Sequence, residues 1–179
     1  MFKDKVATAV GDLQYGIARK SGTDSLQKSL QTRLSTLPTS AVASVDLRAA
    51  FQTVDRAKAC QAVAKHAPSL AASCQAWYMG EAEHSIFDMH GIRHSVSTNV
   101  GVDQGCPLGA FMFATAMRDA AERVLQFARS LDPNAGFYMY LDDCYILADP
   151  TCMDAILDFA VDAFASIGLE VKPSKTQVW

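Results

Sequence analysis

The sequence predicts an α+β fold in which helices cover an antiparallel sheet. Two pairs of β-type segments, 84–89 with 93–98 and 137–141 with 144–148, are each joined by only two or three residues. Connections this short join antiparallel strands, because parallel strands need a crossover of about a dozen residues or more. Longer segments with helical spacing lie between the pairs. Half of the 179 residues are apolar, which is enough for one domain to bury a core.

The N-terminal part of the chain is predicted to hold two helices and a loop. The first helix follows from apolar residues at helical spacing: Phe2, Val6, Val10 and Leu13. Residues 16–22 begin and end with glycine and are expected to form a loop. Thr23 or Asp24 is expected to cap a second helix that ends before Pro38. Its apolar face consists of Leu26, Leu30, Leu34 and Leu37.

The rest of the chain alternates between strands and helices. The apolar run 41–47 predicts a buried strand that ends near Asp46. Two short strands are expected after Gly168, at 169–172 and 177–179. Helices are predicted in four segments whose ends are marked by proline or glycine: 57–67, 69–79, 107–131 and 150–167.

Composition and charge argue against several classes of protein. No apolar segment reaches the roughly 20 residues of a membrane-spanning helix, and the charged N-terminus lacks the apolar stretch of a secretory signal. We therefore expect a protein that is neither inserted in a membrane nor secreted. The formal net charge is -3, so nucleic acid would not be attracted by bulk positive charge, although residues 1–45 are locally basic. The five cysteines include no C-x-x-C pair, which argues against a zinc ribbon.

Three aspartates are the first candidates for chemistry. Asp142 and Asp143 are adjacent between two apolar strand segments, and Asp46 follows another strand. Neighbouring carboxylates repel one another unless a cation neutralises them, and Mg²⁺ takes one or two carboxylates while leaving positions for phosphates. If the strands are neighbours, the aspartates could hold two metal ions for in-line phosphoryl transfer. The residues alone leave open a plain hairpin turn, in which aspartate is common.

Four segments carry a more specific pattern. They read VDLRAAF at 45–51, GVDQGCPLG at 101–109, YLDD at 140–143 and GLEVKPSKT at 168–176. In this order they resemble motifs A, B, C and D of reverse transcriptases, most of all those of non-LTR retroelements (retrotransposons). Residues 14–24 are similar to the fingers-side segment that precedes motif A, so the resemblance spans nearly the whole chain.

The resemblance implies the roles of particular residues. Asp46 and Asp142 would bind two metal ions, and Asp143 would complete the acidic cluster. The residues implied to contact the incoming nucleotide are Phe51, Gln104, Gly105 and Lys175. Among these, the phenylalanine matches a gate beside the sugar that favours deoxynucleotides, and the glutamine and glycine match the loop by the templating base. The lysine matches one that meets negative charge on the phosphates.

The same resemblance specifies the fold and the partners. It implies a palm-type antiparallel sheet backed by helices over residues 41–179, preceded by a partial fingers-side helical segment over 1–40, with no thumb. The implied activity is RNA-directed DNA synthesis by two-metal nucleotidyl transfer, with a nucleic-acid template–primer and deoxynucleoside triphosphates (dNTPs) as partners. Mg²⁺ is the expected ion, and Mn²⁺ could replace it. Other segments of a larger retroelement polyprotein are candidate partners, and the expected location is intracellular, nuclear or cytoplasmic.

The chain also departs from the family pattern in ways that support an alternative. The three aspartates are intact. The residues that depart from the family pattern lie in or beside the motifs and are Gln52, Cys106, Gly109 and Lys172. Together with the expectation of incomplete fingers and no thumb, they are compatible with a truncated, inactive retroelement remnant that at most binds nucleic acid.

Three other patterns have ordinary explanations. An acidic stripe opposite the apolar face of a helix is explained by solvation: Asp154, Asp158 and Asp162. A zinc site at Asp88, His90 and His94 would need a further ligand. Cys106 could be a reactive thiol at a helix N-terminus, but no histidine is tied to it in the sequence.

Overall fold

The computed structural model describes residues 2–179. The helices are α1 (Phe2–Val10), α2 (Gly22–Thr36), α3 (Ala50–Thr53), α4 (Arg56–His66), α5 (Pro68–Tyr78), α6 (Pro107–Leu131) and α7 (Met153–Ala165), with short 3-10 helices η1 (Pro150–Cys152) and η2 (Pro173–Lys175). The strands are β1 (Ala41–Val45), β2 (Ala82–Phe87), β3 (Arg93–Thr98), β4 (Gly136–Tyr140), β5 (Asp143–Ala148) and β6 (Gln177–Val178).

Four strands form the main sheet in the order β4-β5-β1-β6, and neighbouring strands are antiparallel. Strand β1 pairs with β5 from Ala41–Ala148 to Val45–Cys144. Strand β4 pairs with β5 up to Tyr140–Asp143, so only two residues form the turn between them. The predicted α+β fold with an antiparallel sheet is confirmed.

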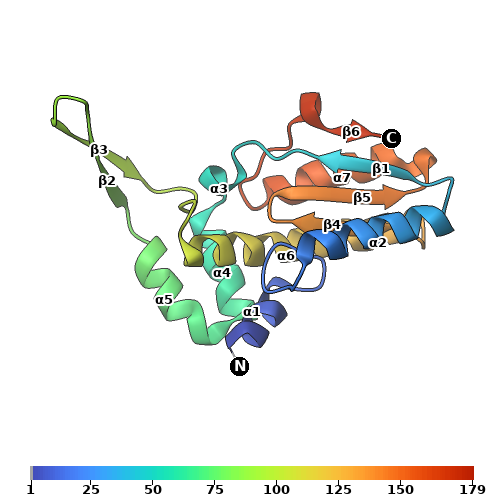
Figure 1. Ribbon diagram of the computed structural model, residues 1–179, viewed down its shortest axis with the longest axis horizontal. Helices are drawn as coiled ribbons and strands as arrows, with labels where there is room; N and C mark the ends of the chain where they lie inside the picture. The colour runs from blue at the N-terminus through green and yellow to red at the C-terminus, as the bar shows by residue number, and fades with distance from the viewer. Residues whose placement is uncertain (1) are drawn as a thin grey trace.

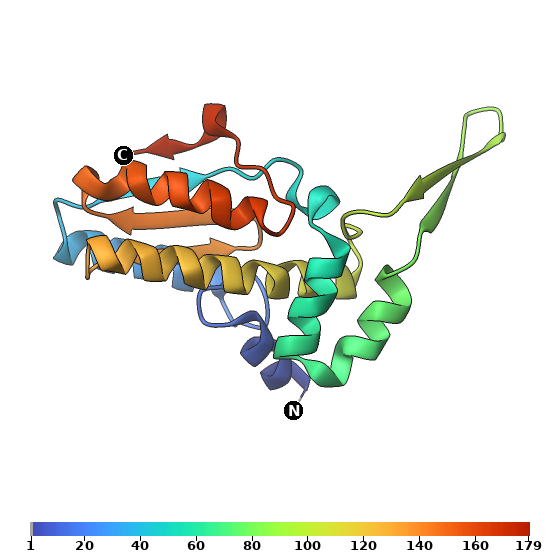
Figure 2. The same cartoon turned by 180° about the vertical axis from the view of Figure 1, so that it is seen from behind.

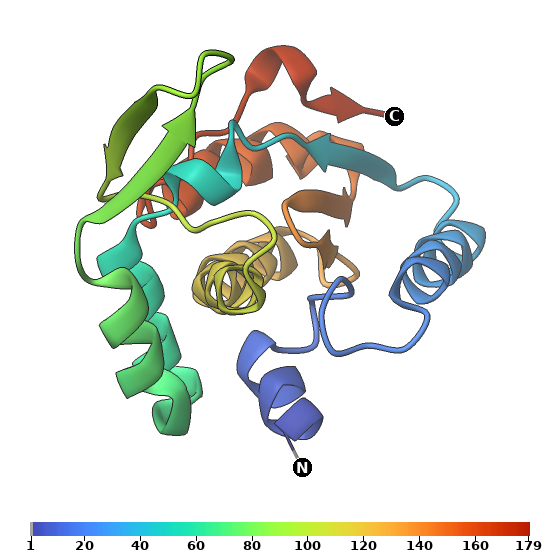
Figure 3. The same ribbon diagram turned by 60° about the vertical axis from the view of Figure 1, so that its left-hand side comes forward.

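The two faces of this sheet have different surroundings. Helices α6 and α7 lie across one face (Figure 2), and α2 lies on the opposite side near β4 (Figure 3). Burial alternates along β1 in agreement with this arrangement, with Ala43 and Val45 buried and Ser44 partly exposed. The face away from α6 and α7 is therefore the one that stays partly open.

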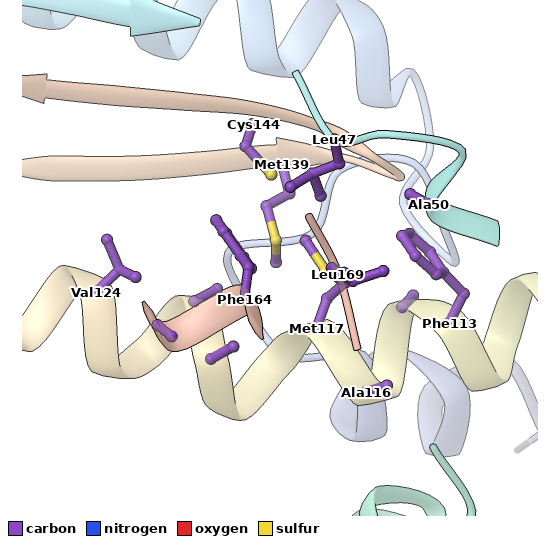
Figure 4. Close-up of a cluster of buried hydrophobic side chains, with 14 of the residues drawn as sticks. Leu47, Ala50, Phe113, Ala116, Met117, Val124, Met139, Cys144, Phe164 and Leu169 are labelled. Carbon is purple, nitrogen blue, oxygen red and sulfur yellow. The ribbon is translucent and has the colours of Figure 1, made fainter. Parts of the chain in front are cut away.

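The core lies between the sheet and helices α6 and α7 (Figure 4). Met117 of α6, Phe164 of α7 and Met139 of β4 are fully buried there. Burying a side chain of this size stabilises a fold by about 1.5–3 kcal/mol. This packing fixes the sheet against the helices, so the ends of β1 and of the β4–β5 hairpin have defined positions.

The hairpin formed by β2 and β3 projects away from the rest of the molecule (Figure 1). Most of its residues are exposed, including Phe87 and Ile86. At its base, the hairpin is preceded by α5 and followed by the loop that leads into α6. Within residues 2–179, no helix has the length and apolar character needed to cross a membrane.

Some local predictions were wrong. Helix α2 begins at Gly22, and Ser21 precedes it with no side-chain cap, so neither Thr23 nor Asp24 is the cap. A glycine is needed at position 22, because its backbone approaches the Tyr15 carbonyl so closely that a Cβ would lie 2.0 Å from the carbonyl oxygen. Segment 169–172 forms a single bridge, Leu47 with Val171, rather than a strand.

Candidate active site

Asp46 and the Asp142–Asp143 pair meet at one end of the main sheet. Val45 pairs with Cys144, so the antiparallel register continued by one residue puts Asp46 opposite Asp143. Residues opposite one another in this way have Cβ atoms about 4.5–5.5 Å apart. Val45 and Cys144 are buried, and side chains alternate along a strand. Asp46 and Asp143, the residues next to them, therefore point to the face away from α6 and α7. Asp142 lies in the turn and Asp143 is the first residue of β5, a small refinement of the prediction that both lie in the turn.

The charges of these three carboxylates interact. Partial desolvation raises the pKa of Asp143, and the negative charges of Asp142 and Asp46 raise it further. Tyr145, two residues along β5 on the same face, has its pKa raised by desolvation and then by the charge of Asp143. In the described part of the chain, no three His, Cys, Asp or Glu side chains are close enough together to form a ready metal site. The aspartates are therefore neighbours in an acidic cluster and not a closed set of ligands.

The turn that carries Asp142 has an unusual backbone conformation and a buried support. Leu141 adopts a φ of 56°, in the left-handed region that leucine rarely visits. The buried side chain of Gln14 accepts a hydrogen bond from the Leu141 N–H at 2.8 Å. The sequence analysis assigned no role to Gln14, because no local pattern shows that a glutamine will be buried against a turn so far along the chain.

The 168–176 segment runs beside the segment that contains Asp46. The Lys172 N–H donates a hydrogen bond to the Asp46 carbonyl oxygen at 2.8 Å. The Arg48 backbone N–H donates one to the Glu170 carbonyl oxygen, also at 2.8 Å. The Arg48 and Glu170 side chains also form an exposed ion pair at 3.3 Å. Lys175 lies in η2 with its side chain exposed. The predicted proximity of Lys175 to a bound nucleotide is not tested and stays a prediction.

The 101–105 loop is bonded to the short helix α3 that follows Asp46. The Gly101 N–H donates to the Val54 carbonyl at 2.9 Å, and the Val102 N–H donates to the Phe51 carbonyl at 2.6 Å. A Cβ on Gly101 would lie 2.3 Å from the Gln52 carbonyl oxygen, which explains why glycine is needed there. Phe51 is buried and its ring stacks on Phe113 of α6, with the ring centroids 4.3 Å apart.

The rest of that loop faces solvent. Gln104 and Gly105 are exposed; Gly105 has a φ of +89°, and nothing lies within 4 Å of a Cβ added there. Burial alone would raise the pKa of the Cys106 thiol, but hydrogen bonding with the Tyr78 hydroxyl and with backbone amides of α6 lowers it overall. The loop thus joins a fixed first half to an exposed second half at the start of α6.

Arg56 is a second buried polar residue that the sequence analysis did not single out. Its guanidinium donates hydrogen bonds to the carbonyl oxygens of Gly101 at 2.6 Å, Thr98 at 3.0 Å and Gly80 at 3.1 Å. These acceptors come from both ends of the β2–β3 hairpin and from the 101–105 loop. One side chain therefore fixes the base of the hairpin and the start of the loop.

This fold is similar to that of solved telomerase chains. It matches Candida albicans telomerase in complex with a fragment of telomeric RNA with a TM-score of 0.71 and 15% identity, covering 89% of this chain and 30% of that one. Apo telomerase from Candida tropicalis gives a TM-score of 0.70 at 10% identity, covering 88% of this chain and 32% of that one. The chain thus spans about a third of the length of these structures, and the likeness concerns the fold.

The chain belongs to the reverse transcriptase family. The family model described as reverse transcriptase (RNA-dependent DNA polymerase) matches residues 2–179. The expectation drawn from the four motifs is therefore confirmed at the level of the family. A search of curated proteins finds no match.

Proposed function

We propose that this chain forms the palm of a reverse transcriptase and extends a primer by copying an RNA template. The observation that carries the proposal is the meeting of Asp46 with Asp142 and Asp143 at one end of the sheet. Membership of the reverse transcriptase family supports it. Residues 41–179 would form the palm, and residues 1–40 would form part of the fingers side.

The donor set fits Mg²⁺, or Mn²⁺ in its place, because both ions prefer carboxylate oxygens. Asp46 and Asp142 would hold two ions, and Asp143 would complete the cluster. Mg²⁺ is bound by one or two carboxylates together with substrate phosphates, so the carboxylates need not form a closed set beforehand. When bound, the ions would lower the pKa of the primer 3′-hydroxyl and neutralise the leaving pyrophosphate. Desolvation and then the charges of Asp142 and Asp46 raise the pKa of Asp143, and a bound cation would relieve the repulsion among these carboxylates.

Four residues would bind and orient the nucleotide. Phe51, which is 8% exposed, would limit space beside the sugar, while its stack on Phe113 keeps the ring in place. Gln104 and Gly105 lie in the exposed half of the loop, where the backbone can approach a base pair. Lys175 would meet negative charge on the triphosphate.

A template–primer is the proposed macromolecular partner. The Candida albicans telomerase structure contains telomeric RNA, which supports nucleic acid as a partner for this related fold. In this chain, the locally basic residues 1–45 include α2, which lies on the partly open side of the sheet (Figure 3). Positive charge there would contact backbone phosphates and position the duplex.

Primer extension tests this proposal. The purified chain, alone and joined to the thumb of a reverse transcriptase, is given poly(A), oligo(dT), dTTP and Mg²⁺. We expect incorporation by the wild type and at least about a hundredfold loss in Asp142→Asn, because metal-bound charge stabilisation contributes several kcal/mol to the transition state. Asp154→Asn, on the exposed side of α7, is the matched control and should stay active. No incorporation by either form of the wild type would contradict the proposal.

The second candidate is a catalytically inactive domain that binds nucleic acid. It is favoured by the departures from the family pattern around the motifs, at Gln52, Cys106, Gly109 and Lys172. This candidate predicts that wild type and Asp142→Asn bind a template–primer equally and that neither extends it. Equal binding with extension only by the wild type would exclude it.

A further inference from the structure

Gln14 lies far from the acidic residues in sequence but contacts the turn that carries Asp142. Gln14 as a whole is only 1% exposed. Its Oε1 accepts hydrogen bonds from the backbone N–H groups of Leu141 and Gly16, both at 2.8 Å. Its Nε2 donates to the Leu141 carbonyl oxygen at 3.5 Å. One side chain therefore bonds both backbone groups of Leu141.

Leu141 needs such support because of its conformation. A φ of 56° is disfavoured for a leucine, and a strained conformation persists only where the surrounding structure holds it. Asp142 is the next residue, so the backbone direction at Leu141 decides where the Asp142 carboxylate points. A turn released from this conformation would move that carboxylate away from Asp46.

Two further observations show that the contact between the 13–16 segment and the hairpin is tight. The Tyr15 N–H donates to the Met139 carbonyl at 2.7 Å, and the Met139 N–H donates to the Leu13 carbonyl at 2.8 Å, so this segment is bonded to β4 just before the turn. A Cβ on Gly16 would lie 2.9 Å from the Leu141 side chain and 3.1 Å from Gln14 Oε1. Residues on both sides of Gln14 in the sequence therefore contact the β4–β5 hairpin: Leu13 and Tyr15 bond Met139, and Gly16 packs against Leu141.

We propose that Gln14 is a positioning residue for the reaction: by bonding both backbone groups of Leu141, it fixes the turn and the direction of the Asp142 carboxylate. The inference rests on the proposed function, in which Asp142 holds a metal ion. Gln14 touches neither substrate nor metal and acts through Asp142. Outer contacts of this kind change metal affinity or activity by roughly 10–100-fold when they are removed.

The test compares three variants of the chain. Gln14→Met keeps the length of the side chain and removes its polar atoms, whereas Gln14→Glu keeps an oxygen acceptor at the same reach. Thr115→Val removes another fully buried polar group, within α6, and is the matched control. Hydrogen exchange of the Leu141 amide reports on the turn, and Mn²⁺ titration followed by electron paramagnetic resonance reports on the carboxylates.

We expect Gln14→Met to speed exchange of the Leu141 amide and to weaken Mn²⁺ binding by about tenfold or more, while Thr115→Val changes neither. Gln14→Glu should keep the slow exchange. In primer extension, Gln14→Met should lower kcat rather than raise the KM for dNTP, because the nucleotide contacts are intact. The inference is overturned if Gln14→Met keeps wild-type exchange at Leu141 or wild-type Mn²⁺ affinity. A wild type that binds no Mn²⁺ contradicts the proposed function instead, and the exchange rate still decides whether Gln14 holds the turn.

Discussion

Asp46 stands opposite Asp143, one residue beyond the last pair of β1 and β5, Val45 with Cys144. Desolvation and the charges of Asp142 and Asp46 raise the pKa of Asp143. The folded state therefore holds a proton on Asp143 more readily than the unfolded chain does. With no cation bound, the ionised cluster makes folding less favourable, and two predictions on stability depend on this.

The first prediction concerns pH. Because the folded pKa of Asp143 lies above its unfolded value of about 3.9, stability falls as pH rises through the interval between the two values. The penalty is absent below that interval and fully present at neutral pH. Asp143→Asn should raise the melting temperature at pH 7 and leave it unchanged at pH 3. The gain is roughly a few tenths of a kcal/mol, because solvent screens an exposed carboxylate.

Glu81→Gln provides the control for this measurement, since Glu81 is also acidic and exposed but lies at the entrance to β2. It should not change the melting temperature in the same pH-dependent way. If Asp143→Asn unfolded at or below the wild-type temperature at pH 7, desolvation and repulsion of the ionised Asp143 would not significantly destabilise the fold.

The second prediction concerns the metal. An ion that binds only the folded state adds RT ln(1 + [L]/Kd), which is about 2.7 kcal/mol at a hundred times Kd. Mn²⁺ should therefore raise the melting temperature of the wild type and have much less effect on Asp46→Asn. Equal shifts in both proteins, measured by calorimetry with and without a chelator, would mean that the ion binds elsewhere.

The third prediction concerns the choice of sugar. Phe51 and Phe113 form one ring stack, and losing it costs about 0.5–1.5 kcal/mol beyond the loss of burial. Phe51→Val and Phe113→Val should therefore destabilise the fold to a similar extent. Only Phe51→Val should raise the incorporation of ribonucleotides relative to deoxynucleotides in competition assays. The same sugar preference in both variants would assign Phe51 to the core alone.

Local signals in the sequence were sufficient for most of the fold. Helix α6 has the predicted bounds because Pro107 opens it and its apolar spacing runs without interruption to Leu131. The β4–β5 hairpin was predicted because two β-type runs are separated by two residues. The meeting of Asp46 with Asp143 followed from the resemblance, since spacing alone cannot show which strands are neighbours.

The parts that could not be predicted depend on contacts between distant segments. Gly22, the first residue of α2, lies so close to Tyr15 that only glycine fits, and the single bridge of Val171 is made with the distant Leu47. Gln14 and Arg56 are polar types that are mostly exposed, so composition points away from their burial. Their partners lie on other elements, and no local pattern specifies them.

The fourth prediction concerns the 101–105 loop. Gly101 has a φ of +74°, and a Cβ there would meet the Gln52 backbone. Gly101→Ala should destabilise the chain by about 1–3 kcal/mol, because both the conformation and the close approach penalise a side chain. Gly80→Ala is the control, since nothing lies within 4 Å of a Cβ added at Gly80, and it should change stability by less than about 0.5 kcal/mol. Urea unfolding that ranks the two variants equally would contradict this account.

The fifth prediction concerns Arg56, whose buried guanidinium holds together the two ends of the β2–β3 hairpin and the loop at Gly101. A lysine ammonium is a compact donor and cannot reach three carbonyl oxygens arranged around a planar group. Arg56→Lys should therefore leave buried acceptors without donors and cost about 1–3 kcal/mol.

Arg48→Lys is the matched control, because the Arg48–Glu170 pair is 65% exposed on both sides and should contribute less than about 1 kcal/mol. Faster amide exchange at Val102 in Arg56→Lys, with no change in Arg48→Lys, would show that the effect reaches the loop. Unchanged exchange at Val102 would mean that the bonds from the loop to Phe51 and Val54 are enough to hold it without Arg56.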